Sequence, residues 1–258
     1  ENNNELLRKK WINYINEKQF NKFSDLNKTN ILIIGNSHAR DMFHAFDFNK
    51  QLFHEYEFTV FDTLLECFKK NINLNYKNKC KYLYDNFDGN RLVNDFKFNL
   101  DNADYVLISA EFSFLDVLRL EDEIIPYLKS KNKKIVLLSN TPKFFFAIKK
   151  PFTLLDLKLR SLKSEKLNHQ DIKQIEKIHY MSITDNIIKL NDWLEGIAER
   201  NDINFLRKED FICDHNLKLC KVLTDEGYKI YWDNSHYTIE GARYLGKIIY
   251  KKKWLDLE

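Results

Sequence analysis

Apolar residues along the chain gather into short runs that are separated by longer amphipathic stretches. The runs typical of strands lie at 31–35, 56–62, 103–112, 133–141 and 203–207. Apolar side chains recur three or four positions apart, as on one face of a helix, in 37–48, 116–132, 182–202 and the segment after 238. This alternation predicts an α/β fold in three layers, with a central parallel sheet of about five strands and helices on both faces.

Two regions depart from this alternation. Residues 66–104 are polar and rich in asparagine up to the third strand, which predicts a long loop with short helical pieces. Residues 144–180 mix aromatic side chains with a charged, helix-compatible segment, and we interpret this region as an insertion or a cap. We expect a helical lead-in or linker at 1–30 and one α/β domain at 31–258.

Charge and length narrow the class of protein. The 41 basic and 38 acidic side chains nearly cancel to +3, so no overall field would attract nucleic acid. With 258 residues, 44% of them apolar, the chain can bury the core of one domain. No run approaches the roughly 20 apolar residues of a membrane helix, and no signal peptide is visible. The start, ENNNELLRKKW, is typical of a piece cut from a longer protein or of a processed mature end.

Four cysteines fall as two local pairs, each of which closes a short polar loop. One pair is Cys67 and Cys80, and the other is Cys213 and Cys220. Two disulfides are the simplest interpretation, and they would place the chain in an oxidising compartment. The alternatives are four free thiols in a cytosolic protein, or a zinc site, although zinc sites usually show cysteines two residues apart.

The stretch ILIIGNSHARDMF carries a serine at the carboxyl end of a strand, directly before a helix. Sites of open parallel sheets gather at this edge. Gly35 allows a sharp turn, and the first amides of the helix favour negative charge, so they could stabilise a tetrahedral oxyanion. Ser37 is therefore a candidate nucleophile. The alternative, which this stretch alone favours, is that Ser37 only caps the helix.

A serine nucleophile needs a base, and the base needs an orienting carboxylate. The stretch DNSH near the end of the chain contains both. Asp233 can fold back onto His236 and hold the tautomer whose other nitrogen accepts the serine proton. The alternative is a surface loop before a helix that Thr238 caps. His38 is expected to pack or hydrogen-bond in the first helical turn, and the remaining histidines show no spacing typical of a metal site.

The two motifs together resemble the SGNH (GDSL-like) hydrolase superfamily, with GNSH as its serine block and DNSHYTIEGARYLG as its Asp-x-x-His block. The chain is most similar to the SGNH domain fused behind the membrane domain of bacterial acyltransferase-3 proteins, which O-acetylate cell-surface polysaccharides. In that group a cysteine pair precedes the second block, as CDHNLKLC does here. The resemblance implies a flavodoxin-like sheet and a triad of Ser37, His236 and Asp233.

Two departures from the family pattern concern the site. Asn36 stands where the family usually has Asp, which removes a charge and adds a donor. We expect a tolerated hydrogen-bonding position, with altered or lost activity as the alternative. The third strand ends in SAEFSF, without the family's Gly-x-Asn. The oxyanion candidates are therefore Ser37, Asn36 and Ala110, and Glu111 and Trp232 are candidates to line the substrate cleft.

The resemblance implies serine-dependent transfer of an acetyl group to a polysaccharide or other glycan in the periplasm or elsewhere outside the cytoplasm. It implies an acetyl donor supplied by a membrane acyltransferase domain or partner, and a membrane tether through a segment outside this chain. No cofactor, metal ion or nucleic acid is expected. A carbohydrate acetylesterase would use the same residues with water as the acceptor. A catalytically silent glycan-binding domain is the alternative of another class.

Overall fold

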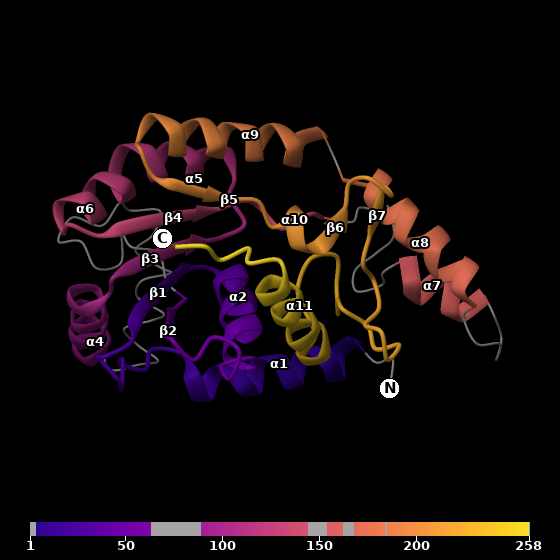
Figure 1. Ribbon diagram of the computed structural model, residues 1–258, viewed down its shortest axis with the longest axis horizontal. Helices are drawn as coiled ribbons and strands as arrows, with labels where there is room; N and C mark the ends of the chain where they lie inside the picture. Colours follow the sequence, from indigo (N-terminus) through magenta and orange to yellow (C-terminus); the bar gives the residue numbers. More distant parts are fainter. Residues whose placement is uncertain (1–3, 63–88, 144–153, 162–167, 184, 258) are drawn as a thin grey trace.

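The computed structural model describes residues 4–62, 89–143, 154–161, 168–183 and 185–257. Five parallel strands form one sheet in the order β2-β1-β3-β4-β5 (Figure 1). The strands are β1 (Thr29–Gly35), β2 (Tyr56–Phe61), β3 (Tyr105–Ser109), β4 (Lys134–Leu138) and β5 (Asn204–Leu206). A separate antiparallel pair consists of β6 (Cys213–Asp214) and β7 (Leu219–Cys220). The predicted α/β class and five-stranded parallel sheet are confirmed.

Helices cover both faces of the sheet. They are α1 (Asn4–Lys18), α2 (Ser37–Asp47), α4 (Gly89–Asn102), α5 (Phe114–Arg119), the π-helical turn η2 (Leu120–Ile124), α6 (Ile125–Ser130), α7 (Leu154–Ser161), α8 (His169–Met181), α9 (Asp185–Arg200), α10 (Glu209–Ile212) and α11 (Ile239–Lys251).

Strand β1 shows why the fold has three layers. Its side chains alternate between two cores, because successive residues of a strand point to opposite faces. Ile31 and Ile33 pack with residues of α1, α2, α10 and α11. Leu32 and Ile34 pack with residues of α4, α5, η2, α6 and α9. All four side chains are buried, which explains the uninterrupted apolar run of this central strand.

The prediction of a loop for residues 66–104 is wrong over α4, a helix of 14 residues. Phe96 and Leu100 lie four positions apart and are both buried against the sheet, so the helical period is present beneath the asparagines. Residues 63–88 lie outside the described residues, and so does the predicted pair of Cys67 and Cys80.

The predicted helix 116–132 is interrupted by η2, which leads into Pro126 in the first turn of α6. Proline has no backbone N–H, so the helical ladder cannot continue unchanged across it. Within the predicted insertion 144–180, the described residues form α7 and α8. Leu155 of α7 and Ile175 of α8 share a small apolar cluster with Val222, apart from the two large cores.

Among the described residues, no helix combines the length and the apolar character that crossing a membrane requires. The boundary at residue 30 stays a prediction. Trp11 and Ile15 of α1 nevertheless pack in the same core as α2 and α11, so α1 is part of the globular unit.

Candidate active site

Ser37 is presented by a tight turn between β1 and α2. Gly35 pairs with Ser109 across the sheet and has a φ of 147°, a region that favours glycine. A Cβ at this position would lie 1.9 Å from the carbonyl oxygen of Ser109. Gly35 therefore lets β1 approach β3 and turn at once, which leaves Ser37 half-buried as the first residue of α2. The N–H of a first helical residue has no acceptor within the helix and can face a ligand.

Asn36, not Ser37, caps α2. Its Oδ1 accepts hydrogen bonds from the N–H of His38 at 3.2 Å and of Glu111 at 3.1 Å. Its Nδ2 donates to the carbonyl oxygen of Glu111 at 3.4 Å. A carboxylate could accept the first two bonds but could not donate the third. The amide therefore fits its place as a clamp between the serine turn and the loop after β3.

His236 and Asp233 lie in the loop that leads into α11. The loop is closed by a bond from the N–H of Trp232 to the carbonyl oxygen of His236 at 3.1 Å. Oδ1 of Asp233 accepts from the N–H of Ser235 at 2.9 Å and of His236 at 2.8 Å. Thr238 caps α11 as predicted by its position, through its side chain and the N–H of Gly241.

The three predicted residues meet in one line of hydrogen-bonding atoms. His236 Nε2 lies 2.8 Å from Ser37 Oγ, and His236 Nδ1 lies 2.8 Å from Asp233 Oδ2. Both are ordinary hydrogen-bond distances. A nucleophile, a base and an orienting acid in this geometry can carry out acyl transfer.

Electrostatics favour the charged forms of the His236 and Asp233 pair. Burial lowers the pKa of His236, but the hydrogen bond with Asp233 and the charge of Asp41 outweigh it, so the pKa is raised. Burial raises the pKa of Asp233, but the hydrogen bond and charge of His236 outweigh it, so that pKa is lowered. Asp233 therefore stays ionised while His236 gains and loses a proton.

Close packing of α11 on α2 brings the two motifs together. Gly246 lies against α2, where a Cβ would be 2.1 Å from the carbonyl oxygen of Ala45. Asn49, just after α2, donates to the carbonyl oxygens of Ala45 at 2.8 Å and of Arg243 at 3.1 Å. These contacts fix the separation of the helices whose first turns lie beside Ser37 and His236.

Aromatic rings hold His236 on both faces. Trp232 stacks on one side with ring centroids 5.0 Å apart and planes 15° apart. His38 stacks with centroids 4.7 Å and planes 10° apart. Trp11 meets the ring edge-on at 6.0 Å. His38 was expected to bond within the first turn, and its N–H does so, but its ring packs on the base instead.

A pocket of about 540 Å³ opens beside Ser37 and His236. Trp232 lines it, as predicted, whereas Glu111 is not among its lining residues. Most of one wall comes from α1 and the residues just after it, and the remainder from α2 and the end of β2. The lining residues are Arg8, Trp11, Ile12, Asn16, Gln19, Phe20, Ser37, Arg40, Asp62, Trp232 and His236.

Glu111 lies on the other side of the site, facing His38. Its Oε2 is 3.5 Å from His38 Nε2, and its other oxygen pairs with Lys143. The hydrogen bond with His38, opposed by burial and supported by Lys143, lowers the pKa of Glu111 to about 2. Ala110 sits between Glu111 and the end of β3. The oxyanion role suggested for Ser37, Asn36 and Ala110 stays a prediction.

The site contains one group of residues that could be considered for a metal ion. His38, Asp41 and His236 each offer a ligand atom within 4.8 Å of the others. The two imidazole rings stack, however, so their in-plane lone pairs lie in nearly parallel planes and do not converge on one point. We therefore interpret the group as part of the proton-transfer site. Asp41 was missed in the sequence, where its only signal is a position one helical turn after Ser37 and His38.

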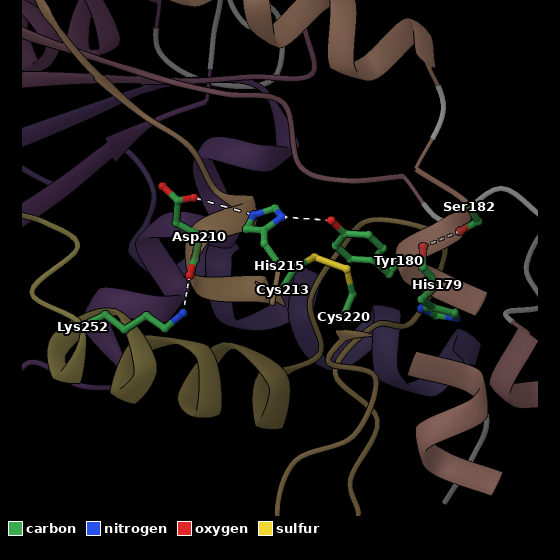
Figure 2. The surroundings of a disulfide bond; sticks show 8 residues. All are labelled: His179, Tyr180, Ser182, Asp210, Cys213, His215, Cys220 and Lys252. Atoms are coloured by element: carbon green, nitrogen blue, oxygen red, sulfur yellow. Dashed lines mark hydrogen bonds and ion pairs between the residues drawn. A yellow bond between two sulfur atoms is a disulfide. The ribbon is translucent and has the colours of Figure 1, made fainter. Parts of the chain in front are cut away.

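Cys213 and Cys220 form a disulfide across the β6 and β7 pair (Figure 2), the pairing that the loop spacing favoured. Figure 2 also shows His215 between two partners. Its Nδ1 lies 3.3 Å from the hydroxyl of Tyr180 in α8, and its Nε2 lies 3.9 Å from the carboxylate of Asp210. The disulfide and these contacts join α8 and α10 to the segment that leads into the Asp-x-x-His loop.

The fold and the site define a parallel α/β protein with a serine, a histidine and an aspartate arranged as in serine acyl-transfer enzymes. Residues 12–251 match the family described as the SGNH domain fused to AT3 domains. The chain belongs to this family. A comparison with curated proteins finds no match.

Two similar solved structures are domains of related architecture. The periplasmic domain of the lipopolysaccharide acetyltransferase of Salmonella ser. Paratyphi A is 15% identical, with a TM-score of 0.59, over 89% of this chain and 85% of that chain. A GDSL-like lipase from Bacteroides thetaiotaomicron is 16% identical, with a TM-score of 0.43, over 94% of this chain and 96% of that chain. At 15% identity, the first likeness establishes the fold. Together with the family, it supports an acyl-related hydrolase or transferase function.

Proposed function

We propose that this domain transfers an acetyl group through an acyl-serine intermediate on Ser37 to a hydroxyl of a polysaccharide outside the cytoplasm. The observation that carries the proposal is the pair of 2.8 Å contacts that join Ser37 to His236 and His236 to Asp233, beside an open pocket. The family, whose members occur fused to AT3 domains, supports a membrane acyltransferase domain as the source of the acetyl group.

In the first half of the reaction, Ser37 Oγ attacks the carbonyl carbon of the acetyl donor while His236 Nε2 takes the hydroxyl proton. Asp233 holds the tautomer of His236 that accepts this proton and stabilises the imidazolium. The tetrahedral intermediate collapses to acetyl-Ser37. His236 returns the proton to the leaving group.

In the second half, a sugar hydroxyl in the pocket attacks the acetyl carbonyl carbon. His236 takes the proton of that hydroxyl, the bond to Ser37 Oγ breaks, and Ser37 regains a proton from His236. Water in place of the sugar gives free acetate, and the domain is then an acetylesterase. The outcome depends on whether the bound sugar excludes water from the acyl-serine.

The experiment is a comparison of wild type with Ser37→Ala and His236→Ala in hydrolysis of 4-nitrophenyl acetate, with intact-protein mass spectrometry of the acetylated form. We expect loss of activity in both variants, and an acetyl group on Ser37 in wild type. Ser24→Ala is the matched control, because Ser24 is an exposed serine that bonds Glu57 at 2.7 Å but has no histidine partner among the described contacts.

Adding an oligosaccharide acceptor separates transferase from esterase. Acetylated oligosaccharide formed at the expense of free acetate supports transfer, whereas undiminished release of acetate supports the esterase. Equal background rates in wild type and both variants, with no acetyl group on Ser37, would contradict the proposal and favour a catalytically silent glycan-binding domain.

A further inference from the structure

A second histidine and carboxylate lie beneath the proposed base. His38 and Asp41 both project from the first turns of α2, and each is about 1% exposed. His38 Nδ1 lies 3.5 Å from Asp41 Oδ2 and 3.2 Å from the hydroxyl of Thr141. One carboxylate oxygen of Asp41 lies within 4.8 Å of a ring nitrogen of His236. His236 thus has Asp233 at its outer nitrogen and a second carboxylate nearby.

The two oxygens of Asp41 differ in their partners. Oδ1 accepts from Trp11 Nε1 at 2.9 Å and from the N–H of Tyr237 at 3.4 Å. Among the described residues, Oδ2 is buried and accepts no hydrogen bond. A buried carboxylate oxygen without a donor is costly unless positive charge lies nearby. Charge that develops on His236 during proton transfer would compensate Asp41 without any rearrangement, which is electrostatic preorganisation.

The ionisable groups around this cluster come from several elements, so Asp41 does not act in isolation. They are Asp233 on the His236 loop, His38, Arg40 and Asp41 on α2, Asp62 after β2, Glu111 after β3, Lys143 after β4, and Lys208 and Glu209 after β5. Glu111 is paired with Lys143, and Arg40 with Asp62. Lys208 is fully buried and reaches Thr141 at 3.4 Å. Asp233 and Asp41 therefore remain as the principal anions available to His236.

We propose that Asp41 and His38 form a second, buried carboxylate–histidine pair that positions His236 and stabilises its imidazolium. The ring of His38 fixes the plane of His236 by stacking, opposite Trp232, and Asp41 supplies the negative charge. Both are positioning residues, since they act through His236. The catalytic part of this inference rests on the proposed function, while the effect of Asp41 on His236 does not.

The first test is an NMR titration of His236 in protein with ¹⁵N-labelled histidine, which requires no activity. Asp41→Asn keeps an oxygen for Trp11 but removes the charge. We expect the titration of His236 to move to lower pH in this variant, and kcat/KM for 4-nitrophenyl acetate to fall on the order of tenfold. Asp47→Asn is the matched control, because it removes a carboxylate from the last turn of the same helix.

The stacking role has its own pair of variants. His38→Ala removes the ring, and we expect kcat to fall on the order of tenfold with little change in KM. His38→Phe restores a flat ring and should recover part of kcat. An unchanged titration of His236 in folded Asp41→Asn would overturn the electrostatic part, and wild-type kcat in His38→Ala would overturn the stacking part. An inactive wild type whose His236 still responds to Asp41→Asn would refute only the proposed function.

Discussion

Gly246 of α11 packs directly on Ala45 of α2, close enough that a single added methyl group would lie 2.1 Å from the Ala45 carbonyl oxygen. The contact involves backbone, which cannot move aside as the end of a flexible side chain can. The two helices would have to separate to make room. Since Ser37 begins α2 and His236 lies just before α11, this contact sets the distance between nucleophile and base.

Gly246→Ala should therefore weaken both the fold and the activity. We expect a loss of about 1–3 kcal/mol in the free energy of unfolding from overpacking, and a larger fractional loss of ester hydrolysis than of folded protein. Gly196→Ala is the control, because its Cβ would meet only the end of Arg200 at 3.3 Å, and alanine favours helix. Chemical denaturation and esterase assays at 25 °C measure both effects. Equal behaviour of the two variants would contradict the interpretation.

The activity should rise with pH through the titration of His236. A general base must be unprotonated, and the hydrogen bond with Asp233 and the charge of Asp41 outweigh burial and raise the pKa of His236. We therefore expect the midpoint of the acid limb of kcat/KM above about 6.5, the ordinary value for histidine. A midpoint below that value would contradict the arrangement of charges.

The same shift has a consequence for stability. A raised pKa means that protonated His236 stabilises the fold, so its contribution is complete below the unfolded value and is lost as the pH rises through the folded value. His236→Gln should accordingly cost more stability at pH 5 than at pH 9. Thermal unfolding of wild type and variant at the two pH values measures this, and a pH-independent difference would be the contrary result.

The wall that α1 gives to the pocket should matter for a sugar acceptor and not for a small ester. Asn16 is exposed and lines the pocket, whereas Asn13 is exposed on the same helix but does not line it. We expect Asn16→Trp to reduce acetyl transfer to an oligosaccharide about tenfold and to leave hydrolysis of 4-nitrophenyl acetate within about twofold. Asn13→Trp should change neither. Equal transfer by the two variants would place the acceptor elsewhere.

Removing the disulfide should destabilise the domain modestly. Cys213 and Cys220 are separated by seven positions, and closing so short a loop in the unfolded chain accounts for roughly 2.5 kcal/mol. We expect the double variant Cys213→Ser, Cys220→Ser to lose about this much in chemical denaturation under oxidising conditions. Activity of the folded fraction should persist, because neither sulfur lies in the triad. An unchanged free energy of unfolding would show that the loop is already ordered without the bond.

The local parts of the site could be predicted from the sequence because each depends on neighbours in the chain. The apolar run that ends at Gly35 dictates a buried strand and a turn, and Asp233 reaches His236 within one loop. The stack of His38 on His236 could not be predicted, because it depends on how α11 packs on α2. Asp41 was hidden for the same reason, since its burial comes from Trp11 on α1 and from Tyr237.

The error over α4 has a different cause. Asparagine is common in loops, and its abundance masked a helical period that Phe96 and Leu100 carry. Burial of those two side chains against the sheet outweighs the weak helix propensity of the intervening residues. Composition was in this case a poorer guide than the spacing of a few apolar positions.

Ser37 and His236 are separated by 199 residues. During synthesis, the serine, its turn and the first strand are complete long before the histidine has been added to the chain. A fragment that ends before residue 233 therefore carries a serine with no base to activate it, however well its sheet has formed. Hydrolysis of esters is thus a property that the polypeptide acquires only when its last helix docks, and a prematurely terminated product would be chemically inert.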